Sequence, residues 1–294
     1  MRIPFTLLAV VAVTAHQTQR PPTFRAETRL VVLQATVRDA HGALVSDLDQ
    51  SAFTVYENGT RQPITLFRRD DVPVSIGLLI DNSGSMRTAR PRVEAAARAF
   101  ANASNPLDEV FVENFADTVH VDVPMTSDLG ALNQGLGAVD AIGGTALYDA
   151  LTTAQAYLDA HATRQRRALV VITDGNDNAS ETTLVQVERQ AEARDTVMYA
   201  IGLFGAQAGA TNRGRREIDR LTTRTGGSAY YPASLDEIDA VALQVAHQIR
   251  SQYTIAYAPL NQSMDGSYRA IRVNVAGHGH LSVQTRSGYR ALAR

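Results

Sequence analysis

The sequence predicts an α/β domain built on a doubly wound, mostly parallel sheet, with an accessory β unit formed by the N- and C-terminal segments. In the middle of the chain, continuous apolar runs such as Val74–Ile80 and Ala168–Ile172 alternate with helical patterns. That alternation is typical of parallel strands buried on both faces. Residues 28–70 and 253–294 show short strands separated by turn residues instead. Each flank is too small to bury a core alone, so we expect the two to pack together.

The N-terminal β segment, residues 28–70, is expected to contain three or four strands. Leu30–Val37 is rich in β-branched residues, and Phe53–Tyr56 and Ile64–Phe67 are two shorter runs of the same kind. Asn58 and Gly59 lie between the two shorter runs and form the strongest short hairpin signal. We therefore expect a hairpin at this turn.

The central domain is expected to span residues 74–252, with strands and helices in alternation. Its further expected strands are Val110–Phe115, Val119–Val123, Val197–Leu203 and Ser228–Tyr231. The expected helices are Pro91–Ala103, Leu129–Ile142, Ala146–Ala160, Thr182–Arg194, Arg216–Thr223 and Leu235–Arg250. The C-terminal segment, 253–294, is expected to add the strands Tyr253–Tyr257, Tyr268–Val275 and Leu281–Thr285.

The first 27 residues have the layout of an export signal followed by a linker. A short charged start precedes the apolar run Ile3–Val13, and small residues then frame a cleavage site after Ala15. We predict a signal peptide over residues 1–15 and a flexible linker over 16–27, which contains Pro21 and Pro22. The alternative is an uncleaved anchor or a buried N-terminal element. The expected mature chain is periplasmic or extracellular, and it has no stretch long and apolar enough to span a membrane.

Composition narrows the classes of function. The formal net charge is −2, so no bulk electrostatic attraction favours nucleic acid. The chain contains no cysteine, which excludes disulfides, thiolate metal sites and cysteine nucleophiles. It also contains no lysine, so every basic side chain except histidine is an arginine.

Three polar loops follow or connect the central strands. Asp81, Ser83 and Ser85 come directly after the buried strand Val74–Ile80, and Asp174 follows Ala168–Ile172. Gly143-Gly144-Thr145 precedes a helix and offers a third hydroxyl. Carboxyl ends of parallel strands meet at one edge of a sheet, where ligands bind. These hard oxygen donors favour Mg²⁺, Mn²⁺ or Ca²⁺ over Zn²⁺ or copper, and Mg²⁺ is the ion we expect.

These loops resemble those of von Willebrand factor A-type (VWA) domains. Asp81–Ser85 (DNSGS) is similar to the family's D-x-S-x-S loop, GGTALYDA from Gly143 to its second metal loop, and ITDG from Ile172 to its third. The three loops occur in the family's order, and the resemblance covers about residues 74–250. The flanking FTVYENG and YTIAYAP are similar to a group of exported bacterial VWA-related proteins.

The resemblance implies a Rossmann-like fold with a metal-ion-dependent adhesion site. Ser83 and Ser85 would coordinate the ion directly, and Thr145 would join them in the ligand-binding state. Asp81 and Asp174 would act largely through bound water. The open coordination position would take a Glu or Asp carboxylate of a protein partner. The expected function is therefore a metal-dependent adhesion or complex-assembly module with no catalytic residues.

Two other functions remain as alternatives. A Mg-dependent hydrolase or phosphoryl-transfer enzyme would use the strand-end Asp81, but such chemistry needs more anionic metal ligands and usually a lysine, which the chain lacks. A serine hydrolase would need a G-x-S-x-G elbow, whereas Asn82 and Gly84 flank Ser83. The second alternative is a passive structural scaffold with a vacant site.

Overall fold

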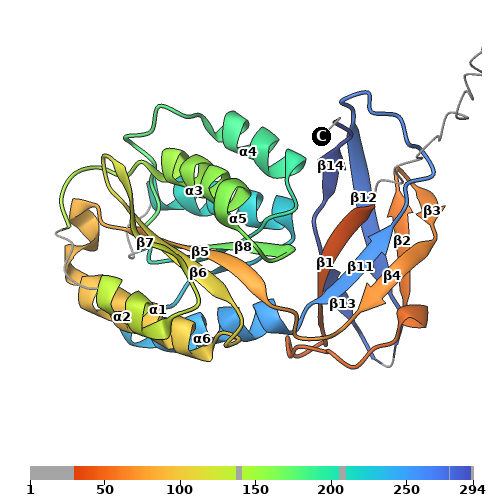
Figure 1. The fold of residues 1–294 in the computed structure, drawn as a ribbon, viewed down its shortest axis with the longest axis horizontal. Coiled ribbons are helices and arrows are strands. Elements are labelled where there is room, and N and C mark those ends of the chain that lie inside the picture. The colour runs from red at the N-terminus through yellow and green to blue at the C-terminus, as the bar shows by residue number, and fades with distance from the viewer. Residues whose placement is uncertain (1–29, 137–140, 205–209, 278, 293–294) are drawn as a thin grey trace, which may run out of the picture.

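The computed structural model describes residues 30–136, 141–204, 210–277 and 279–292. It contains an α/β domain and a β-sandwich that lie side by side (Figure 1). This arrangement confirms the predicted fold class, including the accessory β unit made from both terminal segments. The predicted signal peptide, 1–15, and linker, 16–27, lie outside the described residues.

The α/β domain is built on a six-stranded sheet with the order β10-β9-β8-β5-β6-β7. All neighbouring strands are parallel except β6 and β7, which are antiparallel. The strands are β5 (Val74–Asp81), β6 (Glu109–Phe115), β7 (Val119–Thr126), β8 (Arg166–Thr173), β9 (Val197–Gly202) and β10 (Ala229–Tyr230). Every residue of β5 and β9 is buried, as expected for strands covered on both faces.

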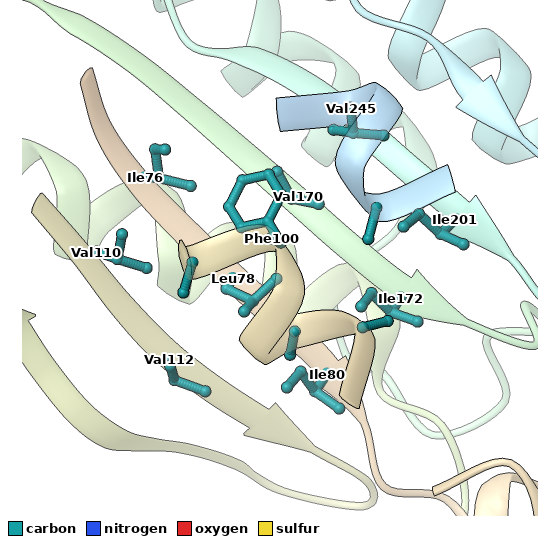
Figure 2. Packing of buried hydrophobic residues seen from close by; sticks show 14 of the residues in the cluster. Ile76, Leu78, Ile80, Phe100, Val110, Val112, Val170, Ile172, Ile201 and Val245 are labelled. Carbon is teal, nitrogen blue, oxygen red and sulfur yellow. The ribbon is translucent and has the colours of Figure 1, made fainter. Parts of the chain in front are cut away.

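Helices cover both faces of this sheet (Figure 1). One layer holds α1 (Arg90–Ala103), α2 (Leu129–Gly135) and α6 (Ile238–Arg250), and the other holds α3 (Leu147–His161), α4 (Leu184–Ala193) and α5 (Ala210–Thr225). Figure 2 shows the first layer, where Phe100 of α1 and Val245 of α6 pack onto Leu78 and Val170 of the sheet. This apolar core holds the strand ends, and hence their loops, in place.

The β-sandwich contains two four-stranded sheets, with the orders β13-β1-β11-β4 and β14-β12-β2-β3. Its strands are β1 (Val31–Arg38), β2 (Phe53–Glu57), β3 (Thr60–Gln62), β4 (Ile64–Arg68), β11 (Tyr253–Tyr257), β12 (Tyr268–Val275), β13 (Ser282–Gln284) and β14 (Gly288–Arg290). β1 lies between β11 and β13, and β12 lies between β14 and β2. The N- and C-terminal segments therefore share both sheets.

The hairpin at Asn58 and Gly59 forms, but with a partner that the sequence did not indicate. Both residues have positive φ, 47° and 82°, as a type I′ turn requires. β2 pairs with β3, a short polar strand, while Ile64–Arg68 crosses to the other sheet after Pro63. The prediction missed β3 because three polar residues carry no apolar alternation.

Two helix predictions were wrong at their ends. The helix expected over Leu129–Ile142 ends at Gly135, where a glycine lowers helix propensity. Ile142 lies instead in a loop, and its backbone N–H donates to Asn82 O at 2.9 Å. The helix expected from Arg216 begins earlier, at Ala210.

Polar contacts join the two units. Gln248 of α6 is fully buried; its amide donates to the Thr36 hydroxyl of β1 at 3.3 Å and accepts from Arg38 at 2.9 Å. Arg290 of β14 forms an ion pair with Glu192 of α4, with 2.7 Å between Nε and Oε2. These contacts attach the β-sandwich to the helices of the α/β domain.

No helix among the described residues is long and apolar enough to cross a membrane.

Candidate metal centre

The first loop begins where β5 ends, at Asp81. This side chain is fully buried, and both of its oxygens accept hydrogen bonds. Oδ1 accepts from the Ser83 backbone N–H at 2.8 Å, and Oδ2 accepts from the Thr173 hydroxyl at 2.6 Å. The hydroxyl oxygens of Ser83 and Ser85 lie 3.1 Å apart. The loop therefore directs two hydroxyls to one point beside an anchored carboxylate.

The second loop is bonded to the first through its backbone. The Gly84 N–H donates to Gly143 O at 3.1 Å, next to the bond between Ile142 and Asn82. Gly143 has φ of +92°, a conformation that favours glycine. Thr145 follows and is buried, and its N–H donates to the side-chain oxygen of Asn178 at 2.9 Å. The second loop is thus hydrogen-bonded to both the first loop and the third.

The third loop is held by Thr173, the last residue of β8. Its hydroxyl donates to Asp81 and accepts the Gly175 N–H at 3.0 Å, so one buried side chain joins loops one and three. Gly175 has φ of +95°, and a Cβ there would overlap the Phe204 ring, 2.1 Å away. Asp174 lies between these two positions and is half-buried. The position of Asp174 is therefore fixed by Thr173 before it and Gly175 after it.

The site holds two carboxylates, those of Asp81 and Asp174, that influence each other. Burial raises the pKa of Asp81 to about 6, against hydrogen bonds from Thr173 and Ser83 that lower it, and the charge of Asp174 raises it further. Among the described residues, no ion pair involves Asp81 or Asp174. A divalent ion between the loops would offset both carboxylates, so the donor set fits such an ion.

The chemistry of the donors also limits how an ion could be held. Within the described part of the chain, no three or more Asp, Glu or His side chains gather closely enough to bind a metal by themselves. An ion here would depend on hydroxyls and water. Both side-chain polar atoms of Asn82 are buried without a hydrogen-bond partner in the structure. The first loop therefore contains a buried amide group whose hydrogen-bonding capacity is unused.

Three residues that position the loops were not identified from the sequence. Thr173 lies within the ITDG motif, but no role follows for it from the sequence, and Asn178 contacts Thr145 from a position that no metal-loop motif includes. Asp117 follows β6, is exposed, and accepts the Gly144 N–H at 2.7 Å. A Cβ on Gly143 would lie 2.2 Å from its Oδ2, which explains why glycine is needed opposite Asp117. Only tertiary structure brings these residues to the site.

A comparison with family models matches residues 76–176 to the von Willebrand factor type A domain. This range includes all three loops. This part of the chain matches the VWA family, and its fold is VWA-like. Domains of this family are protein-interaction modules that often carry a metal-ion-dependent adhesion site. No curated protein sequence matches the chain.

Two solved structures agree on the fold of the VWA domain. A von Willebrand factor type A protein from Catenulispora acidiphila is 14% identical, with a TM-score of 0.54, over 92% of this chain and 75% of its own. Proximal thread matrix protein 1 from the mussel byssus, with a zinc-occupied adhesion-site motif, is 17% identical, with a TM-score of 0.53, over 66% of this chain and 50% of its own. At these identities the likeness concerns the fold alone.

Proposed function

We propose that this chain is an exported protein-binding module that captures an acidic residue of a partner through a divalent metal ion, most suitably Mg²⁺. The observation that carries the proposal is that Asp81 and Asp174 lie near each other and form no ion pair within the described ranges, beside two hydroxyls only 3.1 Å apart. Such a shell is rich in neutral oxygens and poor in direct anionic ligands. The ion would remain electrophilic and would attract an outside carboxylate.

Each site residue has a distinct role in the proposal. Ser83, Ser85 and Thr145 would hold the ion through their hydroxyls, and Asp81 and Asp174 would act through bound water. Mn²⁺ and Ca²⁺ suit the same donors. The bound ion would supply Lewis acidity toward the partner's carboxylate, whereas the protein residues supply the neutral oxygens and the fixed negative field that retain it.

An enzymatic function has less support. An aspartyl phosphate would form on Asp81, but this side chain is fully buried and both of its oxygens accept hydrogen bonds from the protein. The sequence contains no lysine to neutralise a phosphate. In the described residues, the hydroxyl of Ser83 is paired with Ser85 and not with a histidine that could act as a base. These features favour binding over catalysis.

Export rests on the sequence of residues 1–15. Mass spectrometry of the mature N-terminus, from protein isolated outside the cytoplasm, tests it directly. Cleavage after Ala15 is the expected result, and an intact Met1 on protein retained in the cytoplasm would contradict export.

The binding function is tested by capture of partners on the immobilised full chain. We expect proteins from the exported fraction to bind in Mg²⁺, to be lost in chelator, and to be lost with Asp81→Ala. The matched control is Asp159→Ala, which removes a carboxylate at the far end of α3 that pairs with Arg167 and Arg194. Equal capture by wild type and Asp81→Ala in both conditions would contradict the proposal.

A further inference from the structure

We propose that Ile142 and Arg87 form a specificity surface beside the metal position. This surface selects a partner segment in which the metal-bound acid is flanked by an aliphatic side chain and by a second carboxylate. The inference rests on the proposed function, because it concerns what surrounds the acid that the ion captures. It adds two residues that contribute no metal ligand.

Ile142 is an apolar side chain that folding leaves in solvent. It is 63% exposed, although its backbone is fixed by the bond from its N–H to Asn82 O and its neighbour Gly143 accepts from Gly84. The side chain therefore projects from a loop that is bonded to the metal loop on both sides. Exposed aliphatic groups on rigid backbone contribute binding energy at small entropic cost.

Arg87 provides a cation next to Ile142. It lies two residues after Ser85 in the 3-10 helix Gly84–Thr88. Ser85 and Arg87 are exposed, whereas Met86 between them is buried. One guanidinium nitrogen, Nη2, lies 3.3 Å from Ala141 O and donates to it, which places the Arg87 head next to Ile142. The ion pairs of the described residues do not include Arg87, whereas nearby Arg90 is paired with Glu94.

Charge complementarity identifies the occupant. A bound divalent ion and the Arg87 guanidinium would form two positive centres, so an acidic protein segment is the complementary partner. The exposed carboxylate of Asp117 accepts from the Gly144 N–H, so a partner acid near Gly144 would be repelled. Arg87 instead contacts Ala141 at the start of the same loop. The opposite charges of Arg87 and Asp117 would orient the partner segment. Its second acid would lie toward Arg87, and its aliphatic residue would cover Ile142.

The test uses phage-displayed nine-residue peptides with a central Glu and all other positions randomised, selected on the immobilised full chain in Mg²⁺. A library with central Gln and a selection in chelator are run in parallel. We expect Glu-dependent, Mg²⁺-dependent binding on wild type, with aliphatic residues enriched at one flanking position and Asp or Glu at another. Ile142→Ser should lose only the aliphatic preference, and Arg87→Gln only the acidic one.

Matched controls are Leu107→Ser and Arg272→Gln. Leu107 is 60% exposed at the opposite edge of the sheet, and Arg272 is exposed on the β-sandwich. Both controls should keep both preferences, and calorimetry should show unchanged Mg²⁺ affinity for all four variants. Glu-dependent binding with flanking preferences unaltered by Ile142→Ser and Arg87→Gln would overturn this inference alone. Absence of any Glu-dependent binding to wild type would instead overturn the proposed function together with it.

Discussion

The interior of the β-sandwich and the loop edge of the α/β sheet accommodate a buried carboxylate in different ways. In the sandwich, Glu57 is 3% exposed, and its Oε2 accepts hydrogen bonds from the hydroxyls of Tyr257 at 2.8 Å and Tyr289 at 3.0 Å. At the loop edge, Asp81 also accepts two hydrogen bonds, but burial raises its pKa to about 6, and the charge of a second carboxylate, Asp174, adds to that rise. The described partners of Glu57 are tyrosine hydroxyls, whereas Asp81 lies near another carboxylate, which is the arrangement that the proposed ion would neutralise.

This difference separates structural acids from the acids of the proposed site. Substitution of a structural acid should change the free energy of unfolding and leave metal affinity unaltered. Substitution at the loop edge should do the reverse. The variants that follow are designed to break or sharpen this contrast.

Glu57→Ala should cause the largest loss of stability. It leaves the hydroxyls of Tyr257 and Tyr289 without their acceptor inside the sandwich, so we expect the free energy of unfolding to fall by about 3 kcal/mol. Urea denaturation followed by circular dichroism measures this loss. Mg²⁺ affinity of the folded variant should equal that of wild type, and a reduced affinity would break the contrast.

Glu113→Gln should stabilise the protein increasingly as pH rises. Glu113 of β6 is fully buried, neither oxygen has a hydrogen-bond partner in the structure, and burial raises its pKa to about 9. Between its ordinary pKa and about 9, the unfolded state ionises while the folded state stays protonated, so wild type loses stability with rising pH. The gain from glutamine should grow by up to about 1.4 kcal/mol per pH unit in this window.

Urea denaturation of both proteins at a series of pH values measures this gain. Glu109→Gln is the control, because hydrogen bonds from Ser75 and Thr163 outweigh burial and lower the pKa of Glu109. That variant should lose stability near neutral pH. A difference between wild type and Glu113→Gln that stays constant with pH would contradict the assignment of a protonated buried acid.

Thr173→Val should have the smallest effect, confined to the metal loops. It removes the hydroxyl that donates to Asp81 and accepts the Gly175 N–H, so we expect Mg²⁺ affinity to fall on the order of tenfold. Calorimetric titration provides the affinity. Thr222→Val is the matched control, since it removes a buried hydroxyl that donates to Ile218 O within α5. Equal losses in both variants would show a general effect of threonine removal.

Local patterns account for what the sequence could predict. Continuous apolar runs such as Val74–Ile80 identify parallel strands, and parallel strands bring their carboxyl ends to one edge of the sheet. The loops around Asp81 and Asp174 are therefore expected near each other from the sequence alone. The turn at Asn58 and Gly59 is likewise identifiable, because positive φ at both positions is a local requirement.

Other features depend on tertiary contacts that no local pattern contains. β3 is too short and polar to be recognised, and it exists because β2 offers it a pairing edge. Thr173 belongs to the ITDG motif, but its role follows only from the hydrogen bond of 2.6 Å that its hydroxyl donates to Asp81. The apolar spacing of the sequence puts Ile142 in a helix, and only its backbone bond to Asn82 shows that it lies beside the site.

The most direct test of the metal site is a calorimetric titration of Mg²⁺ into the chelator-treated full chain. We predict one ion bound per chain for wild type and for Asp159→Ala, and no measurable binding for Asp81→Ala, with all three proteins folded by circular dichroism. A wild type that binds no divalent ion, or an Asp81→Ala variant that binds as wild type does, would contradict the claim that the three loops form a metal site.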